Sequence, residues 1–262
     1  MVHADLLMAV LAGLICGSFA NVLIARLPRR ESILWPGSRC PECRTPLKWY
    51  DNVPILGFLV LKGKCRTCKH PISTRYPLVE LLTALLFLAT MMKFGPSVSL
   101  FVRDWPLLVM LVTITFIDLD HRIIPDRLSI GGAAWGLVCS LIFPDAWPTY
   151  GWQQALLGAA AGFFGFYLVA WIYSRRSGRA GLGGGDIKLL AMLGAFFGPG
   201  GVFVTVLISS ILGSVVGITW ALASGEKNLL KASIPYGPFL VLGALYYYLL
   251  GDILWLPFTI PT

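Results

Sequence analysis

Two short acidic segments stand at the edges of apolar stretches. Residues 116–126 read Phe-Ile-Asp-Leu-Asp-His-Arg-Ile-Ile-Pro-Asp, and residues 183–188 read Gly-Gly-Gly-Asp-Ile-Lys. Ionisable side chains at membrane depth are costly and usually functional. Two aspartates held about 3 Å apart cannot both ionise cheaply, so they share one proton; one acts as base on water and the other as acid toward a carbonyl. One carboxylate from each segment therefore predicts an aspartyl protease at the edge of a bilayer.

Each aspartate also has a purely structural explanation. Asp118 and Arg122 are four residues apart and can form a helical ion pair. Asp126 and Asp186 each stand just before an apolar stretch, where an aspartate can cap a helix. Capping alone gives no reason for the three glycines at 183–185, which allow a tight loop and a close approach of a substrate chain. Taken together, the segments favour function over capping.

Four cysteines form a second candidate site in the only sizeable polar loop, residues 28–75. They are Cys40 and Cys43 of one CxxC motif and Cys65 and Cys68 of another. Two such pairs complete the tetrahedral thiolate shell of a structural zinc site. Two disulfides are the alternative, but the charge pattern described below places this loop in the cytoplasm, where thiols stay reduced. Because four thiolates leave no open coordination position, we expect Zn²⁺ to fold the loop without taking part in catalysis.

The elements that position these residues are predicted to be membrane helices. The chain is 56% hydrophobic and only 13% charged, with a mean hydropathy of +0.75, which is too apolar for a soluble domain of 262 residues. We predict an all-α, polytopic membrane protein with about eight transmembrane helices. The apolar stretches are Leu6–Leu27, Tyr76–Phe94, Leu100–Ile117, Leu128–Phe143, Gln154–Tyr173, Ile187–Phe197, Val202–Ala223 and Ile234–Leu254.

Positive charge predicts the orientation. Nineteen of the 21 Lys and Arg residues fall in alternate loops, and only Lys93 and Arg103 fall on the opposite side. The positive-inside rule then puts these loops in the cytoplasm and both termini outside. Topology explains the net charge of +8 without nucleic acid, and the basic face can attract anionic lipid. No basic residue precedes the first helix, so we expect it to be retained. The predicted domains are this helix (1–27), the zinc-binding loop (28–75) and a peptidase core (76–262).

Taken together, the motifs resemble those of bacterial type IV prepilin peptidases, which are GxGD-type membrane aspartyl proteases. The resemblance implies that Asp118 and Asp186 are the catalytic pair, with Asp120 as the rival for the first position. Asp118 is preferred because the family's catalytic aspartate stands eight residues before the acid that follows the Ile-Pro step, here Asp126. The matching segments are Gly17-Ser-Phe-Ala-Asn21-Val-Leu-Ile-Ala-Arg-Leu-Pro28, the double CxxC loop, Tyr76-Pro-Leu-Val-Glu80, Asp118–Asp126 and Gly183-Gly-Gly-Asp186-Ile-Lys188.

The resemblance also implies the reaction. Such enzymes remove the basic leader of type IV prepilins or type II secretion pseudopilins after a glycine, on the cytoplasmic side of the bacterial inner membrane. They then methylate the new N-terminus with S-adenosylmethionine. The chain has no glycine-rich Rossmann fingerprint, so we expect the cofactor near the cysteine loop and Glu80, with Asn21 as a further pocket residue. We also expect Lys188 to keep a carboxylate charged.

Two other functional classes fit part of the pattern. A proton-coupled transporter or channel uses buried acids as relays, and a zinc-stapled assembly factor would carry out no chemistry. Transporters often contain inverted repeats and a charged site at mid-membrane. Here the acids stand at helix ends, and no internal repeat is evident from the sequence. Peptide cleavage that depends on a carboxylate pair separates the protease from both alternatives.

Overall fold

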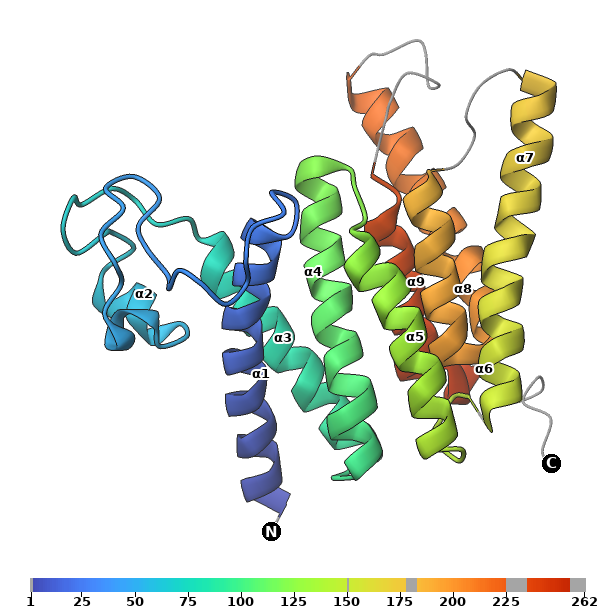
Figure 1. Ribbon diagram of the computed structural model, residues 1–262, viewed down its shortest axis with the longest axis horizontal. Helices are drawn as coiled ribbons and strands as arrows, with labels where there is room; N and C mark the ends of the chain where they lie inside the picture. Colours follow the sequence, from blue (N-terminus) through green and yellow to red (C-terminus); the bar gives the residue numbers. More distant parts are fainter. Residues whose placement is uncertain (1, 150, 178–182, 225–234, 255–262) are drawn as a thin grey trace. The chain divides into compact units, whose positions relative to one another are not determined.

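The regular secondary structure is helical in the part of the chain that the computed structural model describes, residues 2–149, 151–177, 183–224 and 235–254 (Figure 1). Within these residues the only β-type pairs are two isolated bridges in the cysteine loop. The helices are α1 (Val2–Arg26), η1 (Trp49–Asn52), α2 (Leu56–Val60), α3 (Arg75–Phe94), η2 (Leu100–Asp104), α4 (Trp105–His121), α5 (Asp126–Ile142), α6 (Gly151–Ala160), η3 (Ala161–Gly165), α7 (Phe166–Ser177), α8 (Gly184–Ser224) and α9 (Gly237–Leu254).

Each apolar stretch predicted from the sequence lies on a helix. Among the described residues, five helical segments are long and apolar enough to cross a membrane, and α5 and α9 are shorter. The predictions of an all-α membrane protein and of about eight helices are confirmed. Residue 234, where the last stretch was expected to begin, lies outside the described residues, as does the basic loop containing Lys227 and Lys231.

A kink divides α8 into the two helices that the sequence predicts. Gly198 has φ +68°, in the left-handed region that favours glycine, and Pro199 follows it. Proline has no N–H to donate to the preceding turn, so the helical hydrogen bonding is interrupted there. The segments before and after the kink correspond to the predicted helices Ile187–Phe197 and Val202–Ala223.

The chain divides into two compact units, residues 1–113 and 114–262, which are described separately. In the first unit α1 packs on α3 through glycines. A Cβ on Gly13 would lie 2.5 Å from the Cα of Ala84, and one on Gly17 would lie 2.6 Å from the Cα of Glu80. Both pairs are four residues apart, so they form one face of each helix. Small residues at such a face let two membrane helices approach closely.

In the second unit α8 is the central element, and α5, α6 and α9 all pack on it. Gly158 of α6 and Gly194 of α8 cross so closely that a Cβ on either would overlap the other's backbone. On α5, a Cβ on Gly136 would lie 2.9 Å from the ring of Phe196. This packing fixes the N-terminal end of α8, which carries Asp186.

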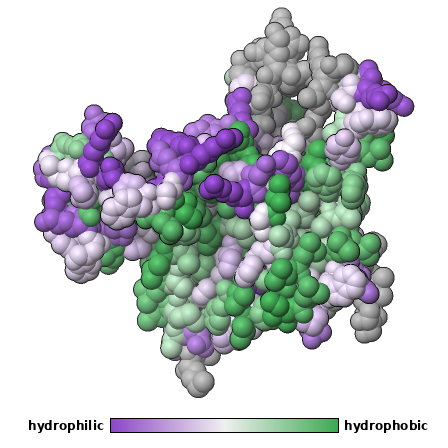
Figure 2. Space-filling model, in the orientation of Figure 1, coloured by the Kyte–Doolittle hydropathy of each residue, from purple (hydrophilic) through white to green (hydrophobic). Residues whose placement is uncertain are grey.

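The outer faces of the helices are apolar, as contact with lipid requires. Side chains such as Phe164 on η3 and Leu222 on α8 are largely exposed, at 66% and 78%. Figure 2 shows hydrophobic residues over the helices and hydrophilic residues gathered over the loops on the visible face. Because an exposed apolar surface of this extent is unusual for a soluble protein, the fold is that of an integral membrane protein.

Candidate active site and cysteine cluster

Asp118 lies in the last turn of α4 and is buried, with 5% of its surface exposed. Its Oδ2 accepts a hydrogen bond of 2.9 Å from the backbone N–H of Gly237, the first residue of α9. A Cβ on Gly237 would lie 2.7 Å from the same oxygen. Position 237 therefore needs glycine for Asp118 to keep this contact. Sequence reasoning missed Gly237; its only local signal is its place between Tyr236 and Pro238.

Asp186 lies in the first turn of α8. At two of the three glycines before it, an added side chain would crowd a neighbouring residue. A Cβ on Gly183 would lie 2.9 Å from Oδ2 of Asp186, and one on Gly185 would lie 3.1 Å from the Cβ of Ile124. Gly184 has nothing within 4 Å of its Cβ position. A side chain at the first position of the GxGD motif would thus displace the Asp186 carboxyl, one at the third would press on Ile124, and the middle position is open.

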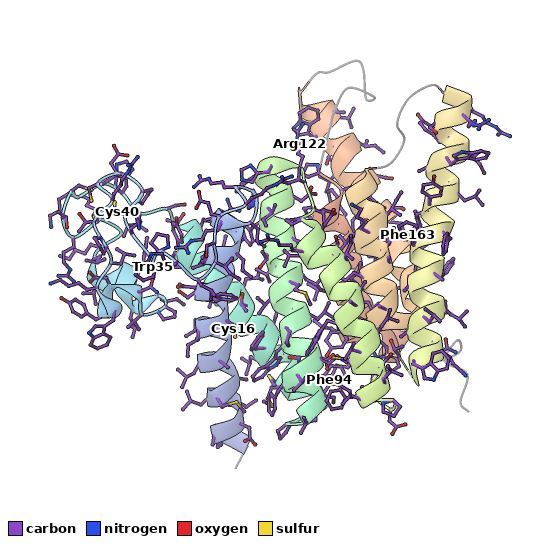
Figure 3. The ribbon with its side chains drawn as sticks, in the orientation of Figure 1. Cys16, Trp35, Cys40, Phe94, Arg122 and Phe163 are labelled. Carbon is purple, nitrogen blue, oxygen red and sulfur yellow. The ribbon has the colours of Figure 1, made fainter. Side chains whose placement is uncertain are left out.

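The two acidic segments come together in the second unit. Asp118 and Asp186 lie close enough to interact electrostatically. Asp120, the rival for the first position, is exposed near the end of α4. Arg122, labelled in Figure 3, follows in the turn between α4 and α5, and its backbone N–H donates to the Asp118 carbonyl oxygen. Of the two candidates on α4, the buried Asp118 is therefore the one placed beside Asp186.

Lys188 forms an ion pair with Asp126, which the sequence had suggested as a helix cap. Its Nζ lies 2.7 Å from Oδ1 of Asp126, so the ion pair joins the N-terminal ends of α5 and α8. Asp126 was expected as a possible cap of α5, but Pro125 occupies the N-cap position and no side chain caps the helix. Asp126 is instead the first helical residue, where its charge is favourable at the positive end of the helix dipole.

The four loop cysteines form a cluster of suitable size for one metal ion. Their Sγ atoms all lie within 4.8 Å of one another. The Sγ atoms of Cys40 and Cys68 are 3.8 Å apart, and those of Cys43 and Cys65 are 3.9 Å apart. A tetrahedral site with metal–sulfur bonds of ~2.3 Å has sulfur–sulfur edges of ~3.8 Å. A disulfide needs ~2.05 Å, so these four thiols fit a shared metal and not two disulfides. Figure 3 shows Cys40 in this loop.

The two CxxC motifs are related by a short repeat. The N–H of Cys40 donates to the carbonyl of Thr45 at 3.0 Å, and that of Cys65 donates to the carbonyl of His70 at 2.8 Å. Arg44 and Lys69 both have positive φ, at 58° and 60°. His70 thus corresponds to Thr45 and lies outside the ligand cluster. Sequence reasoning found no internal repeat and so missed this short one. In each copy a basic residue precedes the CxxC motif, and a second basic residue and then a proline follow it.

Hydrogen bonds within the loop change the pKa values of the cysteine thiols. Hydrogen bonds from the backbone of Cys68 and then Thr67 lower the pKa of Cys65. Hydrogen bonds with the side chain and then the backbone of Thr45 lower the pKa of Cys43 to about 6. A hydrogen bond from the backbone of His70 lowers the pKa of Cys68, but burial and hydrogen bonds with the other three thiols outweigh it and raise this pKa to about 11. Since the thiolate is the form that binds metal, the surroundings of Cys43 and Cys65 favour metal binding near neutral pH, whereas Cys68 must lose its proton when the metal binds.

Comparison with known proteins places the chain in a family. Residues 11–94 match the family model of the Bacterial Peptidase A24 N-terminal domain, and residues 105–218 match that of the Type IV leader peptidase family. The chain is also 37% identical to a prepilin leader peptidase/N-methyltransferase of Xanthomonas campestris, over 92% of this chain and 89% of that protein. This chain belongs to the type IV leader peptidase family. The resemblance seen in the sequence motifs is confirmed.

Two further relatives carry the same name. The protein of Myxococcus xanthus is 45% identical over 82% of this chain, and the match covers 63% of that protein. The protein of Neisseria gonorrhoeae is 32% identical over 95% of this chain and 91% of its own length. The chain thus spans less than two thirds of the Myxococcus relative and about nine tenths of the other two. No solved structure matches the chain.

In this family member the first unit holds a separate buried polar cluster around Glu80. Glu80 is 7% exposed, and its Oε2 accepts a 2.7 Å hydrogen bond from the N–H of Ile55. The Ser18 side chain also hydrogen bonds to Glu80, and Nδ2 of Asn21 donates to the Tyr76 carbonyl at 3.0 Å. Ile55 has φ 57°, which is strained for a β-branched residue. Such strain is most often found at functional sites.

Proposed function

We propose that this leader peptidase cuts prepilins or type II secretion pseudopilins with Asp118 and Asp186 as its catalytic pair. The observation that carries the proposal is that both carboxyls lie in one unit and that each has a glycine against it. Gly237 donates its N–H to Asp118, and Gly183 leaves room for the Asp186 carboxyl. The family and the names of its relatives support the peptidase activity, and with it a prepilin substrate.

The proposed mechanism needs one proton shared by the two carboxyls. The ionised member takes a proton from a water molecule, which attacks the scissile carbonyl carbon, while the protonated member donates to the carbonyl oxygen. As the C–N bond of the tetrahedral intermediate breaks, the proton taken from water passes to the leaving amine, and a hydroxyl proton of the intermediate returns to the carboxylate that had donated its own. The hydrogen bond from Gly237 fixes the orientation of the Asp118 carboxyl for these steps. Because the two groups interact, they titrate as a pair.

We propose that the second activity, N-methylation, depends on the Glu80 cluster of the first unit. S-adenosylmethionine supplies the methyl group when bound. The buried Glu80 carboxyl, Asn21 and the strained Ile55 support this position for the cofactor, since each holds a polar group at the base of the cysteine loop. Glu80→Gln, which keeps an oxygen to accept from Ile55, should lose methylation and keep cleavage. The exposed Glu31→Gln is the matched control.

We also propose that the loop metal is Zn²⁺. The four-thiolate shell and the ~3.8 Å sulfur–sulfur edges support zinc, which would hold the two CxxC motifs together. All ligand positions are then filled by protein, so the ion takes no part in cleavage or methylation.

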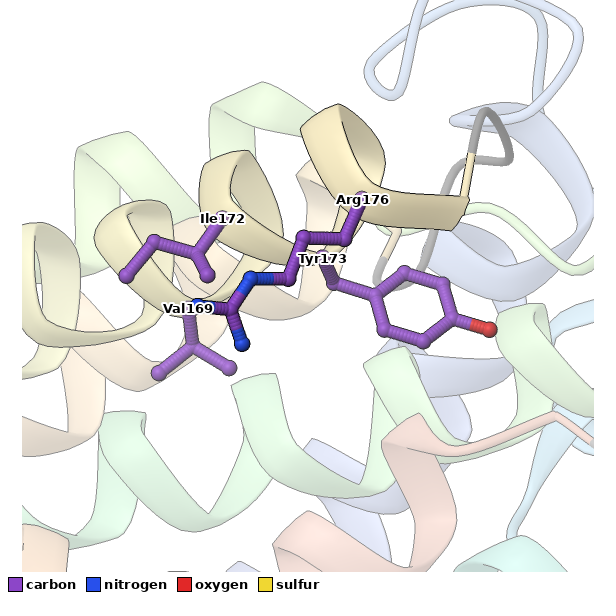
Figure 4. Close-up of a pocket in the computed structure, with 4 residues that line it drawn as sticks. All are labelled: Val169, Ile172, Tyr173 and Arg176. Atoms are coloured by element: carbon purple, nitrogen blue, oxygen red, sulfur yellow. The ribbon is translucent and has the colours of Figure 1, made fainter.

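The membrane placement follows the charge pattern. Exposed arginines lie in the turn between α4 and α5, at the start of α5 and in the last turn of α7, and these charges support a cytoplasmic catalytic face in the bacterial inner membrane. They are Arg122, Arg127, Arg175 and Arg176. On α7, Arg175 lies 4.7 Å from the centre of the Trp171 ring. Arg176 and Tyr173 line a shallow hollow of about 400 Å³ (Figure 4), which suits contact with anionic lipid.

Cleavage and methylation of one substrate test the proposed function together. A full-length prepilin in liposomes is incubated with the enzyme, with and without S-adenosylmethionine, and the products are weighed by mass spectrometry. We expect leader removal in both reactions and an added methyl group only when the cofactor is present. An intact prepilin in both reactions would contradict the proposal.

A further inference from the structure

A groove lies between the second half of α8 and the start of α9, the helix whose first residue contacts Asp118. Its volume is about 300 Å³. Gly237, whose N–H holds Asp118, directly follows one of the lining residues, Tyr236. One wall of the groove therefore adjoins, along the chain, the residue that contacts Asp118. It is lined by Ser210, Gly213, Ser214, Tyr236 and Phe239.

Tyr236 holds one wall of the groove in place. Its hydroxyl lies 2.8 Å from Oγ of Ser209 and 3.3 Å from Oγ of Ser210, so α8 and α9 are joined at this level. A Cβ on Gly213 would meet the Tyr236 ring at 3.6 Å and the Phe239 ring at 3.8 Å, which are ordinary van der Waals distances. Packing of α8 on α9 therefore does not require glycine at 213. A larger side chain there would instead occupy the groove.

The surroundings of the groove select the kind of molecule that can enter it. Ile211 and Val215, beside it on α8, are 53% and 55% exposed, as expected of residues that face lipid. A chain segment that reaches the groove from lipid must satisfy its own backbone hydrogen bonds and is therefore helical. Ser210, Gly213 and Ser214 are small, which permits close approach of such a helix.

We propose that this groove binds the apolar helical segment of a prepilin that adjoins the scissile peptide bond. The inference rests on the proposed peptidase function, because the cut bond must reach Asp118. Binding here would hold the substrate helix against α8. The scissile peptide bond, which adjoins that helix, would then lie near Gly237 and Asp118. The groove thereby contributes to substrate affinity and leaves proton transfer to the two aspartates.

Filling the groove tests this proposal by kinetics. Gly213→Leu and the exposed Ser214→Leu should each raise KM for full-length prepilin about tenfold with kcat unchanged, because the lost contact stabilises substrate and transition state equally. Gly165→Leu on η3 is the matched control, since nothing lies within 4 Å of its Cβ position. It should change neither constant. An unchanged KM in both groove variants, or an equal change in the control, would overturn the proposal.

A photocrosslink separates this proposal from the proposed function. A photoreactive amino acid is placed at position 214, or at 165 as control, in the Asp118→Asn enzyme, so that bound prepilin should stay uncut. We expect a covalent adduct with prepilin from 214 only. An adduct only with lipid or with a second copy of the enzyme would overturn the groove assignment. Continued cutting by Asp118→Asn would instead overturn the catalytic assignment, whatever the crosslink shows.

Discussion

At the scale of single residues, the proposed mechanism depends on glycines that make room for two carboxyls. Gly237 contacts Asp118 from 119 positions away in the chain, and a Cβ at 237 would lie 2.7 Å from its Oδ2. Gly237→Ala should displace the Asp118 carboxyl and lower kcat for prepilin cleavage about 10²-fold, the effect expected for a misplacement of about 1 Å. Gly131→Ala on α5, with open space at its Cβ position, should leave kcat unchanged. Equal activity in both variants would contradict the role of Gly237.

The GxGD motif gives a second prediction with its control built in. Gly183→Ala and Gly185→Ala should each reduce cleavage, because the added Cβ meets Asp186 in one case and Ile124 in the other. Gly184→Ala should be tolerated, since nothing lies within 4 Å of its Cβ position. Initial rates of the three purified variants on the same prepilin measure this. A loss of cleavage rate in Gly184→Ala as large as in Gly183→Ala would show that the glycines are needed for backbone flexibility and not for the absence of a side chain.

Sequence reasoning identifies the acids of the site more readily than their partners. Asp118 and Asp186 stand out because carboxyls are rare in apolar stretches. Gly237 does not stand out, because it acts through its N–H and its lack of a side chain. Asp126 does stand out in the sequence, but its role does not, because its partner is a lysine 62 residues away. Both roles arise from helix packing, which the local pattern does not contain.

At the scale of elements, the cysteine loop should depend on its metal. Chelation, or Cys40→Ser combined with Cys65→Ser, removes ligands from the four-thiolate cluster. We expect about one zinc per wild-type chain, almost none in the double variant, and faster proteolysis within residues 28–75, because structural zinc supplies folding free energy. Cys16→Ser and Cys139→Ser, which change cysteines outside the cluster, should leave the zinc content unchanged. Full zinc occupancy in the double variant would sink the assignment.

An ion pair within the same loop gives a pH-dependent prediction. Arg66 binds the Asp51 carboxyl through Nη2 at 2.5 Å and Nε at 3.1 Å, and these hydrogen bonds hold the pKa of Asp51 below its usual value. A lowered folded-state pKa means that the contribution to stability is present at neutral pH and is lost as the pH falls through the folded pKa. Asp51→Asn should therefore speed loop proteolysis at pH 7.

The difference between Asp51→Asn and the wild type should shrink as the pH falls, because the wild-type carboxyl becomes protonated. Glu42→Gln, at an exposed position in the same loop, should match the wild type at every pH. A difference in proteolysis rate that stays constant between neutral and acid pH would show that Asp51 stabilises the loop independently of its charge.

The sequence predicts elements well where the pattern is local. The Gly198-Pro199 step separates two apolar stretches, and α8 kinks there. Apolar length locates the other helices in the same way. The repeat between the two CxxC motifs was missed because each is short and their intervening residues differ. Its signal is present in the sequence, as a basic residue before each CxxC and a basic residue after it.

At the scale of the whole molecule, the charge pattern predicts the orientation in the membrane. The positive-inside rule predicts that a reporter fused after Trp147 is external and one fused after Ser224 is cytoplasmic. Paired reporters that are active on opposite sides of the membrane measure this. The reverse pattern would place the carboxyls on the wrong side for a cytoplasmic leader and would contradict the proposed catalytic face.

The central claim is that Asp118 and Asp186 together cut the substrate. The most direct test compares cleavage of a full-length prepilin in liposomes by the wild type, Asp118→Asn, Asp120→Asn and Asp186→Asn, with products identified by mass spectrometry. We expect Asp118→Asn and Asp186→Asn each to lose at least about 10²-fold in rate, since each removes one acid–base partner. The exposed Asp120→Asn should retain activity. Cutting that survives both the Asp118→Asn and the Asp186→Asn changes would contradict the aspartyl mechanism.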